Sequence, residues 1–129
     1  MSETSKNLER PLSPHLQVYK PQMTSMLSIL HRASGFALAV GSVMVIWWLI
    51  AAATSQEAYD TAMQFTAHPI GTLMIMGWSF ALYYHMLNGV RHLIWDTGRM
   101  FNIGCATKAG YLVFWGSVVV TALTWVFSY

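Results

Sequence analysis

The residue best placed to do chemistry is His85, which lies inside a long uncharged run, residues 61–90. An ionisable side chain at membrane depth is costly and usually marks an ion path, a proton relay or a cofactor. A neutral imidazole is a good axial ligand for haem iron, and Gly89, one helical turn further on, leaves room for a flat macrocycle. A histidine that is hydrogen-bonded to a hydroxyl on a neighbouring helix fits the same pattern. The sequence leaves both interpretations open.

A polar group follows His85 along the same helical face. His92 lies two turns further on, Asp96 lies one turn beyond it, and Arg91 is beside them. Such cations and donors would hold the propionates of a haem bound at His85. The same residues are also typical of inner-face positive charges with Asp96 as an ion-pair partner, so this group alone favours neither interpretation.

A second group lies near the start of the first predicted helix, with Ser28, His31, Arg32 and Gly35 at spacings that share one helical face. Hydroxyl and guanidinium donors at the edge of an apolar slot suit a quinone carbonyl, because they stabilise the negative charge that builds on oxygen during reduction. A snorkelling Arg32 and an interfacial His31 explain the same spacing, and spacing alone favours this simpler interpretation.

The other histidines are poorly placed to complete a haem site. The helical rise puts His68 roughly 25 Å from His85, so the two cannot bind one iron, and His15 lies in a polar segment. His31 is not excluded geometrically. If haem binds, we expect its other ligand to come from a partner chain.

The elements that must position these residues are membrane helices. The chain is 55% hydrophobic and 9% charged, with a mean hydropathy of +0.43, which is not a soluble composition. Three runs without Asp, Glu, Lys or Arg (33–56, 61–90 and 109–129) can each cross a hydrocarbon core of roughly 30 Å as a helix. We therefore predict an all-α integral membrane protein with three transmembrane helices, at about 24–53, 69–96 and 109–127, after a polar N-terminal arm over 1–23. Three short helices enclose little, so we expect them to form part of a hetero-oligomeric helix bundle.

The basic residues predict an orientation. All seven lie before the first uncharged run or between the second and third runs, on one side of the membrane (Lys6, Arg10, Lys20, Arg32, Arg91, Arg99 and Lys108). The N-terminus is therefore expected in the cytoplasm and the C-terminus in the periplasm, or in the matrix and the intermembrane space if the chain is mitochondrial. The small net charge of +2, clustered at this face, favours contact with anionic lipid or an acidic partner rather than nucleic acid.

Three segments together resemble a known family. They are Arg10-Pro11-Leu12-Ser13-Pro14-His15, Ser28-Ile29-Leu30-His31-Arg32-Ala33-Ser34-Gly35, and a signature of His85, Asn88, Gly89, Arg91, His92, Leu93, Trp95 and Asp96. In this order they resemble the cytochrome b556 subunits of succinate dehydrogenase, the larger membrane anchor of respiratory complex II. The resemblance covers nearly the whole chain.

The resemblance implies roles for individual residues. His85 would be one axial ligand of haem b, with the other on a second, smaller anchor subunit. Ser28 and Arg32 would line a ubiquinone pocket completed by an iron–sulfur subunit and that second anchor. Three residues would lie near the haem propionates (His31, Arg91 and His92), and Asp96 would belong to a proton path.

The implied function is that of an anchor in succinate:ubiquinone oxidoreductase. It would hold a flavoprotein and an iron–sulfur subunit at a bacterial or mitochondrial inner membrane and would have no stand-alone activity. Two alternatives stay open at this point. One is the anchor of a quinol:fumarate reductase, and the other is a haem-free structural membrane anchor.

Overall fold

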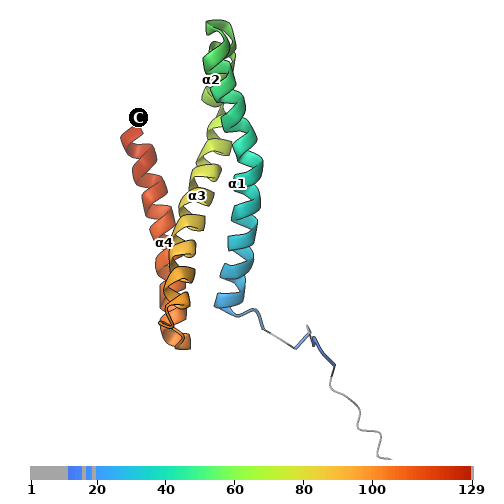
Figure 1. The fold of residues 1–129 in the computed structure, drawn as a ribbon, viewed down its shortest axis with the longest axis vertical. Coiled ribbons are helices and arrows are strands. Elements are labelled where there is room, and N and C mark those ends of the chain that lie inside the picture. Colours follow the sequence, from blue (N-terminus) through green and yellow to red (C-terminus); the bar gives the residue numbers. More distant parts are fainter. Residues whose placement is uncertain (1–11, 16, 19, 129) are drawn as a thin grey trace, which may run out of the picture.

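Four helices make up the part of the chain that the computed structural model describes, residues 12–15, 17–18 and 20–128 (Figure 1). They are α1 (Met23–Thr54), α2 (Gln56–Ala67), α3 (Pro69–Asp96) and α4 (Ile103–Ser128). Helices α1, α3 and α4 are long and apolar enough to cross a membrane. The protein is therefore an all-α membrane protein with three spanning helices. The expected polar arm over 1–23 lies largely outside the described residues.

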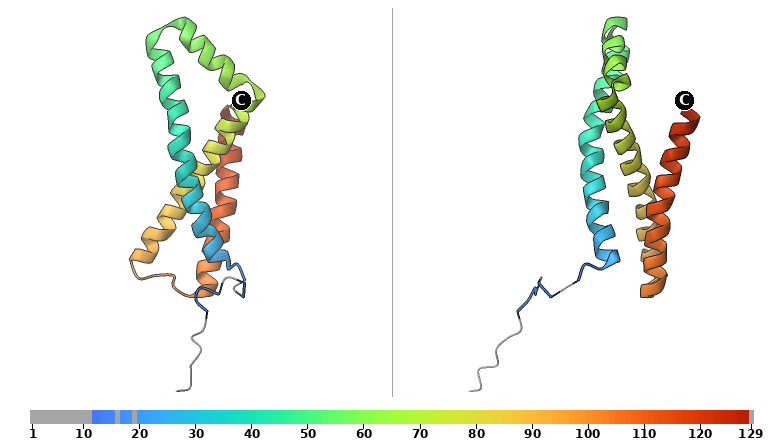
Figure 2. Two further views of the ribbon diagram at one scale, coloured as in Figure 1. Left: turned by 90° about the vertical axis from the view of Figure 1, so that its right-hand side faces the viewer. Right: turned by 180° about the vertical axis from the view of Figure 1, so that it is seen from behind.

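Helix α2 lies in the segment between the first two predicted helices, where no helix was expected. It follows α1 after a single residue, Ser55, whose hydroxyl accepts a hydrogen bond from the Ala58 N–H at 3.2 Å. Glu57 in the first turn also suits the positive end of the helix dipole. A search for uncharged runs does not detect α2, because the helix is polar and contains Glu57 and Asp60. In the structure it slants across the far end of the bundle, from α1 to α3 (Figure 2).

Local sequence also explains the bounds of the other helices. Helix α3 has Pro69 at its first turn, and the His68 ring accepts from the Ile70 N–H at 3.3 Å. Helix α4 begins at Ile103 and not near 109, because the Asn102 side chain accepts from the Gly104 N–H at 2.9 Å. Its first turns therefore include Lys108. The prediction placed the start of this helix after that lysine, because it was based on the uncharged run 109–129.

Helix α3 is the central element of the bundle. It crosses α1 (Figure 2), and one of the contacts between the two helices is the Trp78 indole, which packs on Gly41 and donates to the Leu38 carbonyl at 3.3 Å. On its other side the Tyr83 hydroxyl lies 2.8 Å from the Thr124 hydroxyl of α4. Helix α4 separates from α3 towards the C-terminus (Figures 1 and 2). Helix α3 thus contacts both other spanning helices and carries His85 on the side that faces α1.

Candidate functional site

His85 is held by its Nδ1 atom against α1. This nitrogen lies 3.1 Å from the Ser34 hydroxyl oxygen and 3.2 Å from the His31 carbonyl oxygen. The Ser34 hydroxyl donates its only proton to the same carbonyl at 2.8 Å, so its oxygen can accept but not donate towards His85. Because a carbonyl oxygen only accepts, this geometry favours the tautomer with the proton on Nδ1 of His85. In the neutral ring this leaves Nε2 with a free lone pair.

Two glycines shape the space around the His85 ring. A Cβ atom at Gly35 would lie 3.0 Å from His85 Cε1, closer than side chains normally approach. Gly35 therefore lets the imidazole rest directly on the α1 backbone. At Gly89, by contrast, an added Cβ would meet nothing within 4 Å, so this part of α3 is open.

Three imidazole rings from two helices form a stack. The His31 ring lies against His85 with centroids 4.1 Å apart and planes at 16°, and against His92 at 5.1 Å and 22°. The Nδ1 atom of His92 lies 2.7 Å from the Asn88 carbonyl, whereas the buried Nδ1 of His31 has no hydrogen-bond partner among the described residues. The lone pair of an imidazole lies in the ring plane, so the stacked His31 and His85 rings cannot ligate one iron from opposite sides.

Ser28 and Arg32 lie on the flank of α1 next to His31. Ser28 is half-buried and Arg32 is exposed. Neither side chain makes a hydrogen bond or ion pair with any other residue that the structure describes. Their donors are thus free to meet a molecule or a partner chain at this flank.

Arg91 points away from the histidine stack, although it is next to His92 in the sequence. Adjacent helical residues project about 100° apart. The Arg91 guanidinium is only 3% exposed, and it donates to Asn88 Oδ1 at 3.1 Å and to the Ala106 carbonyl at 3.3 Å. It also lies 4.0 Å from the centre of the Trp95 ring. Its Nε atom has no hydrogen-bond partner among the described residues.

The remaining predicted residues lie apart from this centre. Asp96 is exposed at the last position of α3. His68 caps the opposite end of that helix. An open groove of about 580 Å³ between the start of α1 and the α3–α4 connection is lined by Trp95 and Phe101 among others, but its lining includes neither Ser28 nor Arg32.

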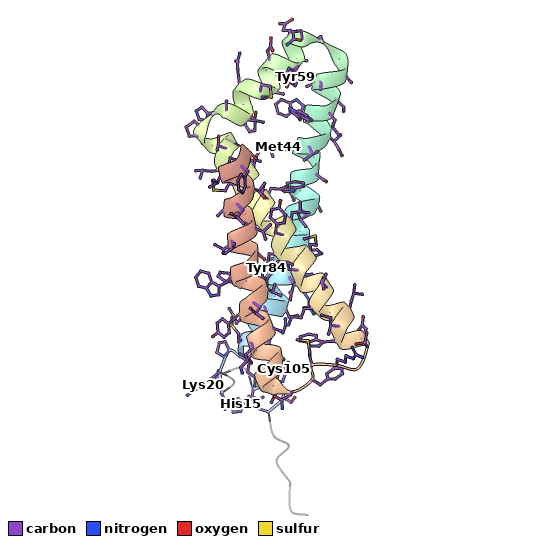
Figure 3. All side chains as sticks on the ribbon, turned by 90° about the vertical axis from the view of Figure 1, so that its left-hand side faces the viewer. His15, Lys20, Met44, Tyr59, Tyr84 and Cys105 are labelled. Carbon is purple, nitrogen blue, oxygen red and sulfur yellow. The ribbon has the colours of Figure 1, made fainter. Side chains whose placement is uncertain are left out.

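Sequence reasoning missed the roles of Ser34, Tyr84 and Asn88. Tyr84 lies within the bundle (Figure 3) and donates to the Leu27 carbonyl at 3.0 Å, and Asn88 is fully buried. The position of Asn88 in an uncharged membrane segment could have indicated such a role, because a side-chain amide there must form hydrogen bonds within the bundle. The identity of those partners depends on how the helices cross and is not encoded in the local spacing.

Known proteins similar to this chain are membrane subunits. The family model for the succinate dehydrogenase/fumarate reductase transmembrane subunit matches residues 6–124. The succinate dehydrogenase cytochrome b556 subunit of Rickettsia conorii is 40% identical over 129 residues, which cover 98% of this chain and all of that protein. The subunit of the same name from Paracoccus denitrificans is 43% identical over 115 residues, covering 89% of this chain and 88% of its own length.

A relative of lower identity is also a cytochrome subunit of succinate dehydrogenase. The succinate dehydrogenase cytochrome b560 subunit of Reclinomonas americana is 32% identical over 127 residues, covering 93% of this chain and 87% of that protein. The likeness extends through all three spanning helices. This chain therefore belongs to the succinate dehydrogenase/fumarate reductase transmembrane-subunit family, and within it to the cytochrome b556 subunits of succinate dehydrogenase.

Proposed function

We propose that this chain anchors a succinate:ubiquinone oxidoreductase in the membrane, binds haem b together with a partner subunit, and contributes to the site of ubiquinone reduction. The observation that carries the proposal is the position of His85 Nδ1, which lies 3.1 Å from the Ser34 hydroxyl oxygen and 3.2 Å from the His31 carbonyl oxygen and so leaves Nε2 for a ligand. Histidines that ligate metals usually donate their other ring N–H to a carbonyl, carboxylate or water. The cytochrome names of the relatives are consistent with this reading.

The residues around His85 fit a haem. The open face at Gly89 leaves room for a flat ring beside α3. The orphaned Nδ1 of His31 would gain a partner in a propionate oxygen, and His92 is a further donor beside it, whereas the buried Arg91 faces α4 and would not reach the group. A buried polar atom without a partner is unfavourable, so a ligand that satisfies it is stabilised. When bound, haem b would supply a one-electron store close to the quinone.

The second axial ligand is assigned to a partner anchor subunit. The stacked geometry removes His31 from consideration, and His68 lies at the far end of α3. Ligation by two histidines keeps the iron closed to oxygen and suits it to electron transfer. The haem would thus be shared between two chains.

The quinone is assigned to the flank that carries Ser28 and Arg32. Both residues are free of partners in the described chain, and together they offer a hydroxyl and a guanidinium to one carbonyl oxygen. These donors would position the ring and stabilise the negative charge that grows on its oxygen. Asp96 is exposed at the end of the same helix as His85, where it would pass protons from the water to the reduced quinone.

The remaining chemistry belongs to other subunits. As a succinate dehydrogenase subunit, this chain is expected to assemble with the other members of complex II. We assign succinate oxidation to a flavoprotein and electron delivery to an iron–sulfur subunit, both docked at the end of the bundle where α1 begins. Lys20 marks this end (Figure 3), which the basic residues assign to the cytoplasm or matrix, with the membrane being the bacterial or mitochondrial inner membrane.

The alternatives use the same fold. In a quinol:fumarate reductase, a similar anchor would transfer electrons from quinol towards fumarate, and the family model is named for both enzymes. The names of the relatives at 40% and 43% identity favour succinate oxidation. In a haem-free anchor, the Ser34 contact would satisfy His85 by itself, and Nε2 would need no ligand.

A spectrum of the assembled complex tests the haem assignment. His85→Ala should abolish or markedly alter the b-type absorbance, because the iron loses an axial ligand. His68→Asn is the matched control, since it alters a histidine at the other end of α3 and keeps a side chain that can cap the helix. An unchanged spectrum in purified, fully assembled His85→Ala complex would refute the ligand assignment.

A comparison of two electron acceptors tests the quinone assignment. Arg32→Ala should depress succinate–ubiquinone activity by about tenfold or more, as expected when a charged hydrogen bond is lost, while dye reduction by the soluble subunits persists. Arg99→Ala, an exposed cation at the same end, should leave both activities unchanged. Normal quinone kinetics in the Arg32 variant would rule out its role, and equal loss of both activities would indicate failed assembly instead.

A further inference from the structure

A chain of buried hydrogen bonds crosses all three spanning helices beside the site. Arg91 of α3 donates to the Ala106 carbonyl of α4 at 3.3 Å and to Asn88 Oδ1 at 3.1 Å. The Asn88 amide nitrogen then reaches the Leu27 carbonyl of α1 at 3.5 Å, and the Tyr84 hydroxyl donates to the same oxygen at 3.0 Å. We call Tyr84, Asn88 and Arg91 the Leu27 clamp.

The direction of each bond in the clamp is determined by chemistry. A guanidinium can only donate, so the oxygen of the Asn88 amide must face Arg91. The amide nitrogen is therefore turned towards Leu27, where it adds a second side-chain donor to that of Tyr84. The three side chains are 2%, 0% and 3% exposed (Tyr84, Asn88 and Arg91 in that order), so water cannot replace a lost partner.

The clamp joins the two segments that carry the proposed site. Leu27 directly precedes Ser28 and lies one helical turn before His31. On the other helix, Tyr84 directly precedes His85, and the backbone carbonyl of Asn88 is 2.7 Å from His92 Nδ1. Every bond to the Leu27 oxygen therefore holds the Ser28 turn of α1 at a set position relative to the His85 segment of α3.

From this juxtaposition, and resting on the proposed function, we propose that Tyr84, Asn88 and Arg91 are positioning residues for haem and quinone. They touch neither group themselves. They set the register between α1 and α3, and hence the distance and angle between the quinone donors and the haem ligand. Arg91 extends this control to α4, because its second bond ties the first turns of that helix to Asn88.

The test compares two neighbouring tyrosines in the assembled complex. Tyr84→Phe removes only the hydroxyl that reaches α1. Tyr83→Phe is the matched control, since its hydroxyl pairs with Thr124 of α4 and does not touch α1. The KM and kcat for a short-chain ubiquinone and the reduction potential of haem b are measured, with succinate–dye activity reporting assembly.

We expect Tyr84→Phe to raise the KM for quinone by about three- to tenfold, as the loss of one hydrogen bond predicts, and to shift the haem potential. Dye reduction and the amount of haem should be unchanged, and Tyr83→Phe should match the wild type. Asn88→Asp is measured in parallel. It keeps an acceptor for Arg91 but cannot donate to Leu27, so we expect the same two changes.

Two outcomes would overturn the proposal. The first is an assembled complex in which both clamp variants have the KM and potential of Tyr83→Phe. The second is failure of both variants to assemble while Tyr83→Phe assembles, because the residues would then serve stability and not position. Arg32→Ala in the same assay separates this result from the proposed function: a normal quinone KM there would refute the quinone site itself.

Discussion

At the scale of single residues, the contacts of His85 distinguish its two ring nitrogens. His85 has two nitrogens, and the Ser34 hydroxyl together with the His31 carbonyl occupies one of them. Ser34 is itself committed, since it donates to that same carbonyl. These two groups, the Ser34 hydroxyl and the His31 carbonyl, leave Nε2 of His85 available, and hydrogen bonds of this kind also raise the basicity of an imidazole that ligates a metal.

Gly35→Ala should disturb this arrangement. The new Cβ would lie 3.0 Å from His85 Cε1, so the ring must shift by a few tenths of an ångström, which changes its contact with α1. We expect a lower haem content and a shifted haem potential in the purified complex. Gly77→Ala is the control, because nothing lies within 4 Å of the added atom. Identical haem spectra and potentials in the two variants would show that close contact with α1 does not position His85.

At the scale of elements, α1 and α3 pack together where a glycine of α1 lies against a tryptophan of α3. In lipid, apolar surface alone gives helices little reason to associate, so close backbone approach and interhelical hydrogen bonds must hold them together. Gly41 provides the close approach for Trp78, whose Nε1 donates to the Leu38 carbonyl. The Leu27 carbonyl provides the second junction, through Tyr84 and Asn88. The two junctions lie on either side of Ser34 and Gly35 along α1.

Gly41→Ala should weaken the pairing of α1 with α3. A Cβ there would overlap the Trp78 ring, and overpacking of this kind costs about 1–3 kcal/mol. The expected result is a lower thermal stability of the membrane domain, measured as loss of haem absorbance on heating. Gly116→Ala should have little effect, because its Cβ would lie 3.6 Å from Leu87, an ordinary contact. Equal stabilities would contradict the packing account.

At the scale of the whole molecule, the three spanning helices leave open grooves between them. Helix α4 leans away from α3 (Figure 1), and an apolar groove of about 570 Å³ opens between them, lined by Phe80 and Trp125 among others. Many large apolar side chains on the spanning helices are exposed, for example Phe36 at 73% and Leu112 at 74%. In a membrane such surfaces face lipid or other helices. The contacts of His85 within this chain likewise use only Nδ1 and leave Nε2 available to a group from outside the chain.

Haem binding should therefore need two chains. The anchor expressed alone should show little b-type absorbance, since it offers one axial ligand, and co-expression with the second anchor subunit should restore it. The measurement is haem per purified chain, with a histidine-free version of the second anchor as the control. Full haem content in the isolated chain would show that both ligands come from within it.

Much of the fold could be predicted because membrane insertion depends on local composition. Uncharged runs locate α1, α3 and α4, and Pro69 marks the start of α3. Helix α2 and the early start of α4 were missed, since their signals are the caps Ser55 and Asn102 and not apolarity. The family was recognisable from motifs that lie close together in the chain, and the comparisons confirm it.

The sequence by itself determined the spanning segments, the polarity of the two membrane faces and the unusual position of His85, because each depends on residues close together in the chain. Only the tertiary structure decided which polar groups meet. It turned Arg91 away from His92 towards α4, placed Ser34 against His85, and brought Tyr84 and Asn88 to the Leu27 carbonyl. The physical reason is that the crossing of α1 over α3 is set by packing at glycines and by buried hydrogen bonds, and neither can be read from one helix alone.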